Sequence, residues 1–310
     1  MIYTLTLNPA MDKTVVIHDL TPGGVNRIQS LRVDVGGKGI NVSKCLKSLG
    51  CDSVAAAFWG GTTGRRGIDF LEENGIGSLA VQVEGDTRTN LKIIDPTRHE
   101  NTDINEPGPT VTQDNLDELV RQLDIHIQPG DILILSGSMP KGCPGSMYRD
   151  LISRYQAKGA SVYLDADGEN FRLGISANPR LIKPNIDELN RHLGTHLTEI
   201  PEIIDAAKQF AAQGIREVVV SLGAEGALLV KEHTAWKADG LSVPVNSTVG
   251  AGDSMVAAFA CGAQLGLTDA QRLKLAVAIS AASVMCSGTQ APDTHTIETL
   301  YHQVTIMEVN

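Results

Sequence analysis

Short apolar runs that alternate with helical patterns constrain the fold of this chain most strongly. The runs at 132–135 (ILIL) and 161–165 (SVYLD) contain few polar residues, and helix-like periodicity occupies 114–126 and 145–158 before them. A strand without polar alternation is buried on both faces, which is typical of a parallel sheet covered by helices. The pattern therefore predicts an α/β fold, a three-layer αβα sandwich.

The segment 80–107 has a different character. Polar and apolar residues alternate there in three short stretches, 80–84, 88–95 and 98–104, and a turn signal stands at Asp95-Pro96. This pattern favours an antiparallel ribbon over another strand–helix unit. With strand-like segments at 14–18 and 31–35, it predicts a small β-sheet lid inserted from about 13–36 and 86–107 into one domain of residues 1–310.

Composition excludes several classes of protein. The formal net charge is -10 with a pI near 5.3, so nucleic acid is not expected as a partner. No basic leader or apolar run of about 18 residues is present, which predicts a cytoplasmic protein without membrane contact. The five cysteines form no CxxC pair and the histidines show no metal-ligand spacing, so we expect reduced thiols and no structural zinc.

The strongest chemical motif spans Ser247 to Met255 (STVGAGDSM) and precedes a long alanine-rich helical pattern. Gly250 and Gly252 flank one small residue directly before Asp253. Unpaired N–H groups at a helix start suit an anion, and glycine lets the backbone approach a phosphate. Asp253 could then accept a proton from a hydroxyl attacking that phosphate. The alternative is a first-turn aspartate that only stabilises the helix.

Two further glycine-rich segments are candidates for ligand binding. Residues 36–41 (GGKGIN) precede a helix and could bind sugar hydroxyls through backbone groups and Asn41, or could form a simple turn. They lack the GK[ST] ending of a phosphate-binding Walker loop. Residues 221–226 (SLGAEG) lie between two apolar runs and could pack against a flat ligand such as adenine, or form a plain β-turn.

Polar residues at regular spacing give two more candidates. Asn185 and Glu188 share one face of a helix start, where they could hold Mg²⁺ through waters or merely cap the helix. Arg88, Asn90 and Lys92 alternate along a strand, as a phosphate clamp or as a solvated edge strand would.

The end of the first strand, residues 8–12 (NPAMD), is the last candidate. Ligands bind at strand carboxyl ends in open α/β sheets, so Asp12 could hydrogen-bond sugar hydroxyls. A simple turn formed by asparagine and proline explains the same residues.

Taken in order along the chain, these motifs resemble the ribokinase-like sugar kinases of the phosphofructokinase B family. The resemblance adds residues 136–140 (SGSMP) and covers nearly the whole chain. It implies the ribokinase-like fold and ATP-dependent phosphorylation of a ketohexose phosphate, most of all fructose 1-phosphate. Tagatose 6-phosphate and fructose 6-phosphate are alternative acceptors, and a non-catalytic sugar or nucleotide sensor is a more distant alternative.

The resemblance also implies roles for individual residues. Asp253 would be the general base, with Gly250, Ala251 and Gly252 around the transferring phosphoryl group. The sugar phosphate would be bound by Asp12, Arg27, Gly37, Lys38, Gly39, Asn41, Arg88, Asn90, Lys92 and Ser138. ATP would be bound by Lys183, Asn185, Ser221, Gly223, Gly226, Thr248 and Ser287, with Glu188 serving Mg²⁺. The resemblance further implies a monovalent cation and a homodimer formed through the lid.

Overall fold

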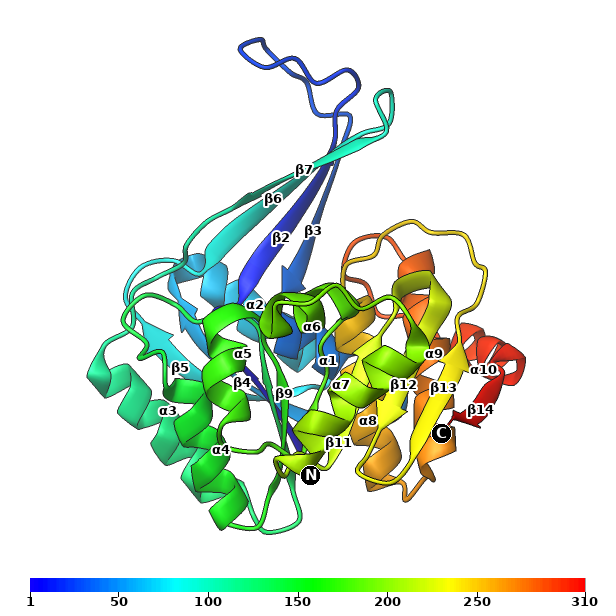
Figure 1. Ribbon diagram of the computed structural model, residues 1–310. Helices are drawn as coiled ribbons and strands as arrows, with labels where there is room; N and C mark the ends of the chain where they lie inside the picture. The colour runs from blue at the N-terminus through cyan, green and yellow to red at the C-terminus, as the bar shows by residue number, and fades with distance from the viewer. Residues whose placement is uncertain (310) are drawn as a thin grey trace.

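A ten-stranded central sheet organises the computed structural model, which describes residues 1–309 (Figure 1). Its strand order is β14-β13-β12-β11-β10-β9-β8-β1-β4-β5. The strands from β11 to β5 run parallel, whereas β12, β13 and β14 add an antiparallel edge. The bounds are β1 (Ile2–Thr6), β4 (Ser53–Gly60), β5 (Gly77–Val83), β8 (Ile132–Ser136), β9 (Ser161–Asp165), β10 (Leu181–Ile182), β11 (Glu217–Ser221), β12 (Gly226–Val230), β13 (Ala235–Asp239) and β14 (Ile306–Val309).

Helices cover both faces of this sheet, which confirms the predicted αβα sandwich. One face carries α1 (Lys38–Ser48), α2 (Gly61–Glu73), α8 (Ala251–Gln264), α9 (Asp269–Met285) and α10 (Thr294–Gln303). The other carries α3 (Gln113–His126), α4 (Met147–Ala157), α5 (Gly168–Ile175), α6 (Ile186–Leu193) and α7 (Ile200–Ala212). The apolar run in β8 supplies both cores: Leu133 and Leu135 pack on the second face, while Ile132 and Ile134 pack on the first.

A separate four-stranded sheet, which we call the lid, projects beyond the carboxyl ends of the parallel strands (Figure 1). Its order is β3-β2-β6-β7, with bounds β2 (Ala10–Val16), β3 (Ser30–Gly36), β6 (Arg88–Asp95) and β7 (Glu100–Asn105). The outer pairs are antiparallel, but β2 and β6 are parallel and join the two chain segments. Directly paired residues share a face, so the register gives the lid one polar and one apolar face.

Two details of the sequence analysis were wrong. Residues 80–84 do not extend the lid, because β5 pairs in parallel with β4 at the edge of the central sheet. Val81 and Val83 are buried whereas Gln82 and Glu84 are exposed, so this edge strand alternates in polarity just as a ribbon strand does, and the pattern could not separate the two. The small sheet also begins at Ala10 rather than near residue 13.

The expectation of five reduced cysteines was also wrong, because Cys51 and Cys261 form a disulfide bond across 210 residues of sequence. Cys51 lies between α1 and β4, and Cys261 lies in α8, so the bond links the α1–β4 connection to a helix that packs against α1. The two cysteines are too far apart in the sequence for a short cysteine-spacing motif to predict this bond. Among residues 1–309, no helix has the length and apolarity needed to cross a membrane.

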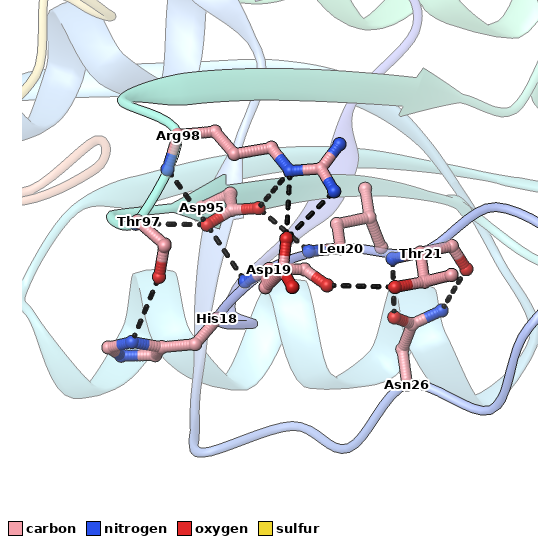
Figure 2. A network of polar contacts seen from close by, with 8 residues as sticks. All are labelled: His18, Asp19, Leu20, Thr21, Asn26, Asp95, Thr97 and Arg98. Atoms are coloured by element: carbon pink, nitrogen blue, oxygen red, sulfur yellow. Dashed lines mark hydrogen bonds and ion pairs between the residues drawn. The ribbon is translucent and has the colours of Figure 1, made fainter.

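The distal end of the lid is held together by the carboxylate of Asp95 (Figure 2). Asp95 is 3% exposed and accepts backbone N–H bonds of 2.7–3.3 Å from four residues: Asp19, Leu20, Thr97 and Arg98. The Arg98 guanidinium adds an ion pair to the Asp19 carboxylate at 2.7 Å. Burial alone would raise the pKa of Asp95, but the four N–H groups outweigh it and lower that pKa. One side chain thus fixes the β2–β3 loop to the β6–β7 turn.

We expect Asp95→Ala to loosen this end of the lid without unfolding the core. Four N–H groups lose their acceptor, so amide exchange in residues 17–29 and 95–99 should accelerate by about tenfold or more. Hydrogen–deuterium exchange by mass spectrometry measures this, with Glu100→Ala on the neighbouring strand as the control. Because the folded pKa is depressed, wild-type protection should be full above Asp95's ordinary pKa and fade as pH falls through the lower folded value. Equal exchange in both variants would contradict the assignment.

Candidate active site

The carboxyl ends of five parallel strands converge on one polar pocket of about 460 Å³ beneath the lid. In a parallel sheet these ends lie at a single edge, and there side chains and loops meet rather than regular backbone. Each of the five strands places a lining residue either at its last position or directly after it. The strands are β1, β8, β9, β10 and β11. The lining includes Thr6, Asn8, Gly37, Lys38, Asn41, Arg88, Asn90, Gly137, Ser138, Asp165, Asp167, Lys183, Asn185, Glu188, Ser221, Val249, Gly250, Gly252 and Asp253.

Asp253 is a buried carboxyl group in this pocket with a raised pKa. It lies in the first turn of α8, after Gly250, whose φ of 87° is one that residues with a side chain rarely adopt. Its side chain is 5% exposed, and its Oδ2 accepts a 2.9 Å hydrogen bond from Asn41 Nδ2. Burial, followed by the charge of Asp165, raises the pKa of Asp253 to about 6, despite the opposing effects of Lys38, Asn41 and Lys183. A base with this pKa is ionised at neutral pH yet retains affinity for a proton.

The start of α8 also offers hydrogen-bond donors. The first helical bond runs from Ser254 N to Gly250 O at 2.9 Å, so the amides of residues 251–253 have no acceptor within the helix. Together with the positive end of the helix dipole, they form a site for negative charge next to Asp253. A phosphoryl group placed there would lie within reach of the carboxylate.

Two ammonium groups balance the buried carboxylates. Lys38 Nζ and Lys183 Nζ each lie 3.4 Å from Asp165 Oδ1, and Asp165 is 1% exposed. Burial would raise the pKa of Asp165, but Lys183 and Lys38 outweigh it and hold that pKa below its ordinary value. Asp165 in turn raises the pKa of Lys38. Asp165 and Lys38 therefore stay charged, and the two lysines bring ammonium groups into the pocket of an otherwise acidic chain.

Several buried acceptor atoms around the pocket have no hydrogen-bond partner among residues 1–309. They are Asn8 Oδ1, Asn41 Oδ1, Asn90 Oδ1 and Asp165 Oδ2. Buried polar atoms are almost always satisfied, so unpaired acceptors at a pocket wall indicate a ligand that donates hydrogen bonds. A molecule with several hydroxyl groups meets this requirement.

The lid closes the pocket from above with its polar face. Asn90 Nδ2 donates to Asp12 Oδ1 at 2.9 Å, and Arg88 Nη2 donates to the backbone oxygen of Asn8 at 2.9 Å. In the described part of the chain, Arg88 Nε has no hydrogen-bond partner. Burial raises the pKa of Asp12 and lowers the pKa of Arg88. The lid thus brings a cation and hydroxyl-binding groups to the polar pocket.

A second cavity of about 590 Å³ adjoins the first across the start of α8. The two share Asn185, Ser221 and Gly252. Gly223, Gly226 and Thr248 line this cavity alone, and its walls are largely apolar: Leu241, Val243, Val245, Met255, Val277, Ala281 and Val284. An apolar slot beside a polar anion site fits a nucleotide, with the base in the slot and the phosphates at the helix start.

The Asn185–Glu188 pair forms a reciprocal capping box at the start of α6. Glu188 N donates to Asn185 Oδ1 at 2.8 Å, and Asn185 N donates to Glu188 Oε2 at 2.9 Å. Both side chains nevertheless line the polar pocket, as do Asp165 and Asp167. No group of three metal-ligating side chains occurs in residues 1–309. These oxygens fit Mg²⁺, which uses few carboxylates and completes its shell with phosphates and waters.

The structure brings together most residues singled out from the sequence. Asp12 and Lys92 line a smaller adjoining chamber of about 230 Å³ that shares Asn90 with the main pocket, and Lys92 lies 3.8 Å from Asp103. Gly39 instead packs against β1, where a Cβ would meet Thr6 Oγ1 at 2.5 Å. Two residues are exposed and lie outside the lining of these cavities: Arg27 in the β2–β3 loop and Ser287 after α9.

The sequence analysis assigned no role to Thr6, Asp165, Asp167, Val249 or the apolar residues of α9. Asp165 is the last residue of β9 and Asp167 lies two residues beyond it, so their place at a strand carboxyl end was the available signal. Val277 and Ala281 offered none, because a cavity wall on a helix has the same apolar spacing as a core-facing stripe.

A polar acceptor pocket, a helix-end anion site with a buried base and an apolar nucleotide slot define a kinase that phosphorylates a hydroxyl group. Comparison with known proteins agrees. The pfkB family of carbohydrate kinases matches residues 5–297. The 1-phosphofructokinase of Rhodobacter capsulatus is 36% identical over 306 residues, which cover 98% of this chain and 97% of that protein.

Solved structures show the same similarity. Phosphofructokinase-2 from Escherichia coli in complex with potassium superposes with a TM-score of 0.92 at 30% identity, covering 97% of this chain and 98% of that one. The tetrameric inhibited form of that enzyme gives a TM-score of 0.90 at 30% identity, with the same coverage. This chain belongs to the pfkB family and is an ATP-dependent carbohydrate kinase.

We expect the decrease of kcat/KM at acidic pH to reflect protonation of Asp253. kcat/KM should fall as pH drops through about 6, because the protonated carboxyl cannot accept a proton. Lys38→Met removes a charge that lowers this pKa, so the decrease should move up by about one pH unit. Steady-state kinetics from pH 5 to 9 would measure it, with Lys141→Met on the surface as the control. If the acidic pKa of the kcat/KM profile is the same in Lys38→Met and in the wild type, the charge of Lys38 does not affect the pKa of Asp253.

Proposed function

We propose that this enzyme transfers the γ-phosphoryl group of ATP to fructose 1-phosphate and forms fructose 1,6-bisphosphate. The observation that carries the proposal is the position of Asp253. It lies at an anion-binding helix start, between a polar pocket rich in unpaired acceptors and an apolar slot of nucleotide size.

In the proposed reaction, the free primary hydroxyl of the sugar lies against Asp253. Its oxygen attacks the γ-phosphorus, the bond to the bridging β–γ oxygen breaks, and the hydroxyl proton passes to Asp253. ADP leaves with the bridging oxygen. The amides of residues 251–253 and Lys183 stabilise the negative charge of the transferring group. Mg²⁺, when bound near Glu188 and Asp167, would neutralise charge on the phosphates.

A phosphorylated acceptor is favoured by the cations in the acceptor pocket. Arg88 and Lys38 both line it, although the chain as a whole carries a net charge of -10. The charge of Asp12 acts on the guanidinium of Arg88, but a phosphate would add a direct ion pair that a neutral sugar cannot form. The similarity to a 1-phosphofructokinase supports fructose 1-phosphate, while tagatose 6-phosphate and fructose 6-phosphate stay as alternatives of the same mechanism.

Two further properties belong to this proposal. One related structure is described as a complex with potassium, so we propose that a monovalent cation supports activity. We also place the enzyme in the cytoplasm, because ATP and sugar phosphates are metabolites of that compartment.

A coupled assay of ADP release tests the proposal with ATP-Mg²⁺ and fructose 1-phosphate, tagatose 6-phosphate, fructose 6-phosphate, fructose, ribose or a nucleoside. We expect the highest kcat/KM with fructose 1-phosphate. Arg88→Ala should raise the KM for this acceptor by about tenfold or more while the KM for ATP changes little. Asp253→Asn serves as the control without turnover.

Each other outcome has a definite meaning. Preference for another ketose phosphate would retain the mechanism and change the substrate. Turnover of unphosphorylated acceptors alone, or equal effects of Arg88→Ala on both substrates, would refute the phosphate clamp. No turnover with any acceptor would favour a sugar or nucleotide sensor.

We also propose that the apolar face of the lid pairs with a second copy of the chain. The register places Leu31, Val33, Leu91, Ile93 and Ile104 on the face opposite the pocket. Leu31 and Ile104 are 57% and 53% exposed. An amphipathic sheet with an uncovered apolar face is a typical interface between identical chains, and a related enzyme is described as a tetramer.

Leu31→Glu combined with Ile104→Glu should therefore shift the enzyme to monomers. Two carboxylates would be buried without partners in the interface, which is unfavourable by several kcal/mol. Light scattering after size exclusion measures the mass, with Ile125→Glu on α3, 58% exposed in the wild type, as the matched control. A wild-type monomer, or a double variant that stays dimeric, would disprove the pairing.

A further inference from the structure

A single buried ammonium group joins the lid, helix α1 and the loop that follows α9. Lys44 lies in α1 and is 8% exposed. Its Nζ donates to Val35 O in β3 at 2.9 Å, to Thr289 O at 2.7 Å and to Thr289 Oγ1 at 3.3 Å. An ammonium group has three N–H donors, so every donor has a protein acceptor.

The elements joined by Lys44 form two walls of the acceptor site. Thr289 and Gly288 line the chamber that also contains Asp12 and Asn90. The loop also touches the lid beside Lys44, since a Cβ on Gly288 would lie 1.8 Å from Arg32 Nη2. Arg32 itself is held by Asp34 at 2.8 Å. The position of the loop therefore follows the position of β3.

The positive charge of Lys44 also influences carboxylates around the acceptor site. Burial lowers the pKa of Lys44, and the charges of Asp34, Asp12 and Asp253 oppose that shift. Lys44 in turn counteracts the rise in the pKa of Asp12. A neutral side chain of equal length would leave two backbone oxygens and these carboxylates without their cation.

We propose that Lys44 is a positioning residue for the acceptor: it holds β3 and the loop 286–293 on α1, so that Asp12 on the lid faces the sugar hydroxyls opposite Asp253. It contacts no reacting atom. Its effect should be specific to acceptor binding, because the nucleotide cavity includes neither Lys44, Val35 nor Thr289. The kinetic part of this inference rests on the proposed sugar kinase function.

The test compares Lys44→Met, Lys44→Arg and the control Lys47→Met. Lys47 lies on the same helix, but its side chain is 47% exposed and pairs with Asp52. We expect Lys44→Met to lower kcat/KM for the sugar phosphate about 100-fold, while the Kd for ATP is unchanged. Lys44→Arg should restore most of the loss, since it keeps the charge and donors. Assays well below the unfolding midpoint of each variant separate positioning from global stability.

A second readout does not depend on any substrate. Hydrogen exchange of residues 30–36 and 286–293 should accelerate in Lys44→Met and stay unchanged in Lys47→Met. Failure of every acceptor to react would refute the proposed function alone, whereas unchanged exchange would overturn the inference about Lys44. Equal losses in acceptor and ATP affinity would also overturn it. If Lys44→Met does not fold, Lys44→Gln, which keeps two N–H donors without the charge, replaces it.

Discussion

A buried negative charge at the start of α8 is the interaction on which the site depends. Removing Asp253 from water is costly, and the nearby carboxylate of Asp165 adds to that cost. The chain offsets it with Lys38, Lys183, a hydrogen bond from Asn41 and the helix start itself. These groups come from three separate segments: α1, the residue after β10 and the start of α8. The central sheet and its flanking helices are therefore needed to hold one carboxylate ionised out of water.

The same arrangement explains how one site can serve two chemically different ligands. The polar pocket and the apolar slot meet at Gly252 at the start of α8, with Asn185 and Ser221 also lining both cavities, so the reacting hydroxyl and the terminal phosphoryl group are guided to one place. The amides there cannot reorient, because they are part of the helix, and little reorganisation is needed during transfer. The lid supplies a further wall of the polar pocket through Arg88 and Asn90.

The sequence predicted the parts of this structure that depend on local patterns. The apolar run of β8 predicted a parallel sheet covered by helices on both faces. The glycines around Ala251 predicted a helix start that could bind an anion. Local patterns were insufficient where distant segments meet. The Cys51–Cys261 bond spans 210 residues, β5 alternates like a ribbon, and Val277 resembles any core residue of a helix. Lys44 illustrates the same limit, since a helical lysine usually lies in solvent and only the tertiary fold buries it.

The parallel pairing of β2 with β6 has a consequence for synthesis of the chain. The β2–β3 hairpin is complete at Gly36, but its partner strand ends only at Asp95. On the ribosome, the hairpin must therefore wait with one open edge and an apolar face while β4, α2 and β5 emerge. During this interval the nascent lid exposes an unpaired strand edge and apolar side chains, which are the features that make an incomplete domain prone to aggregation.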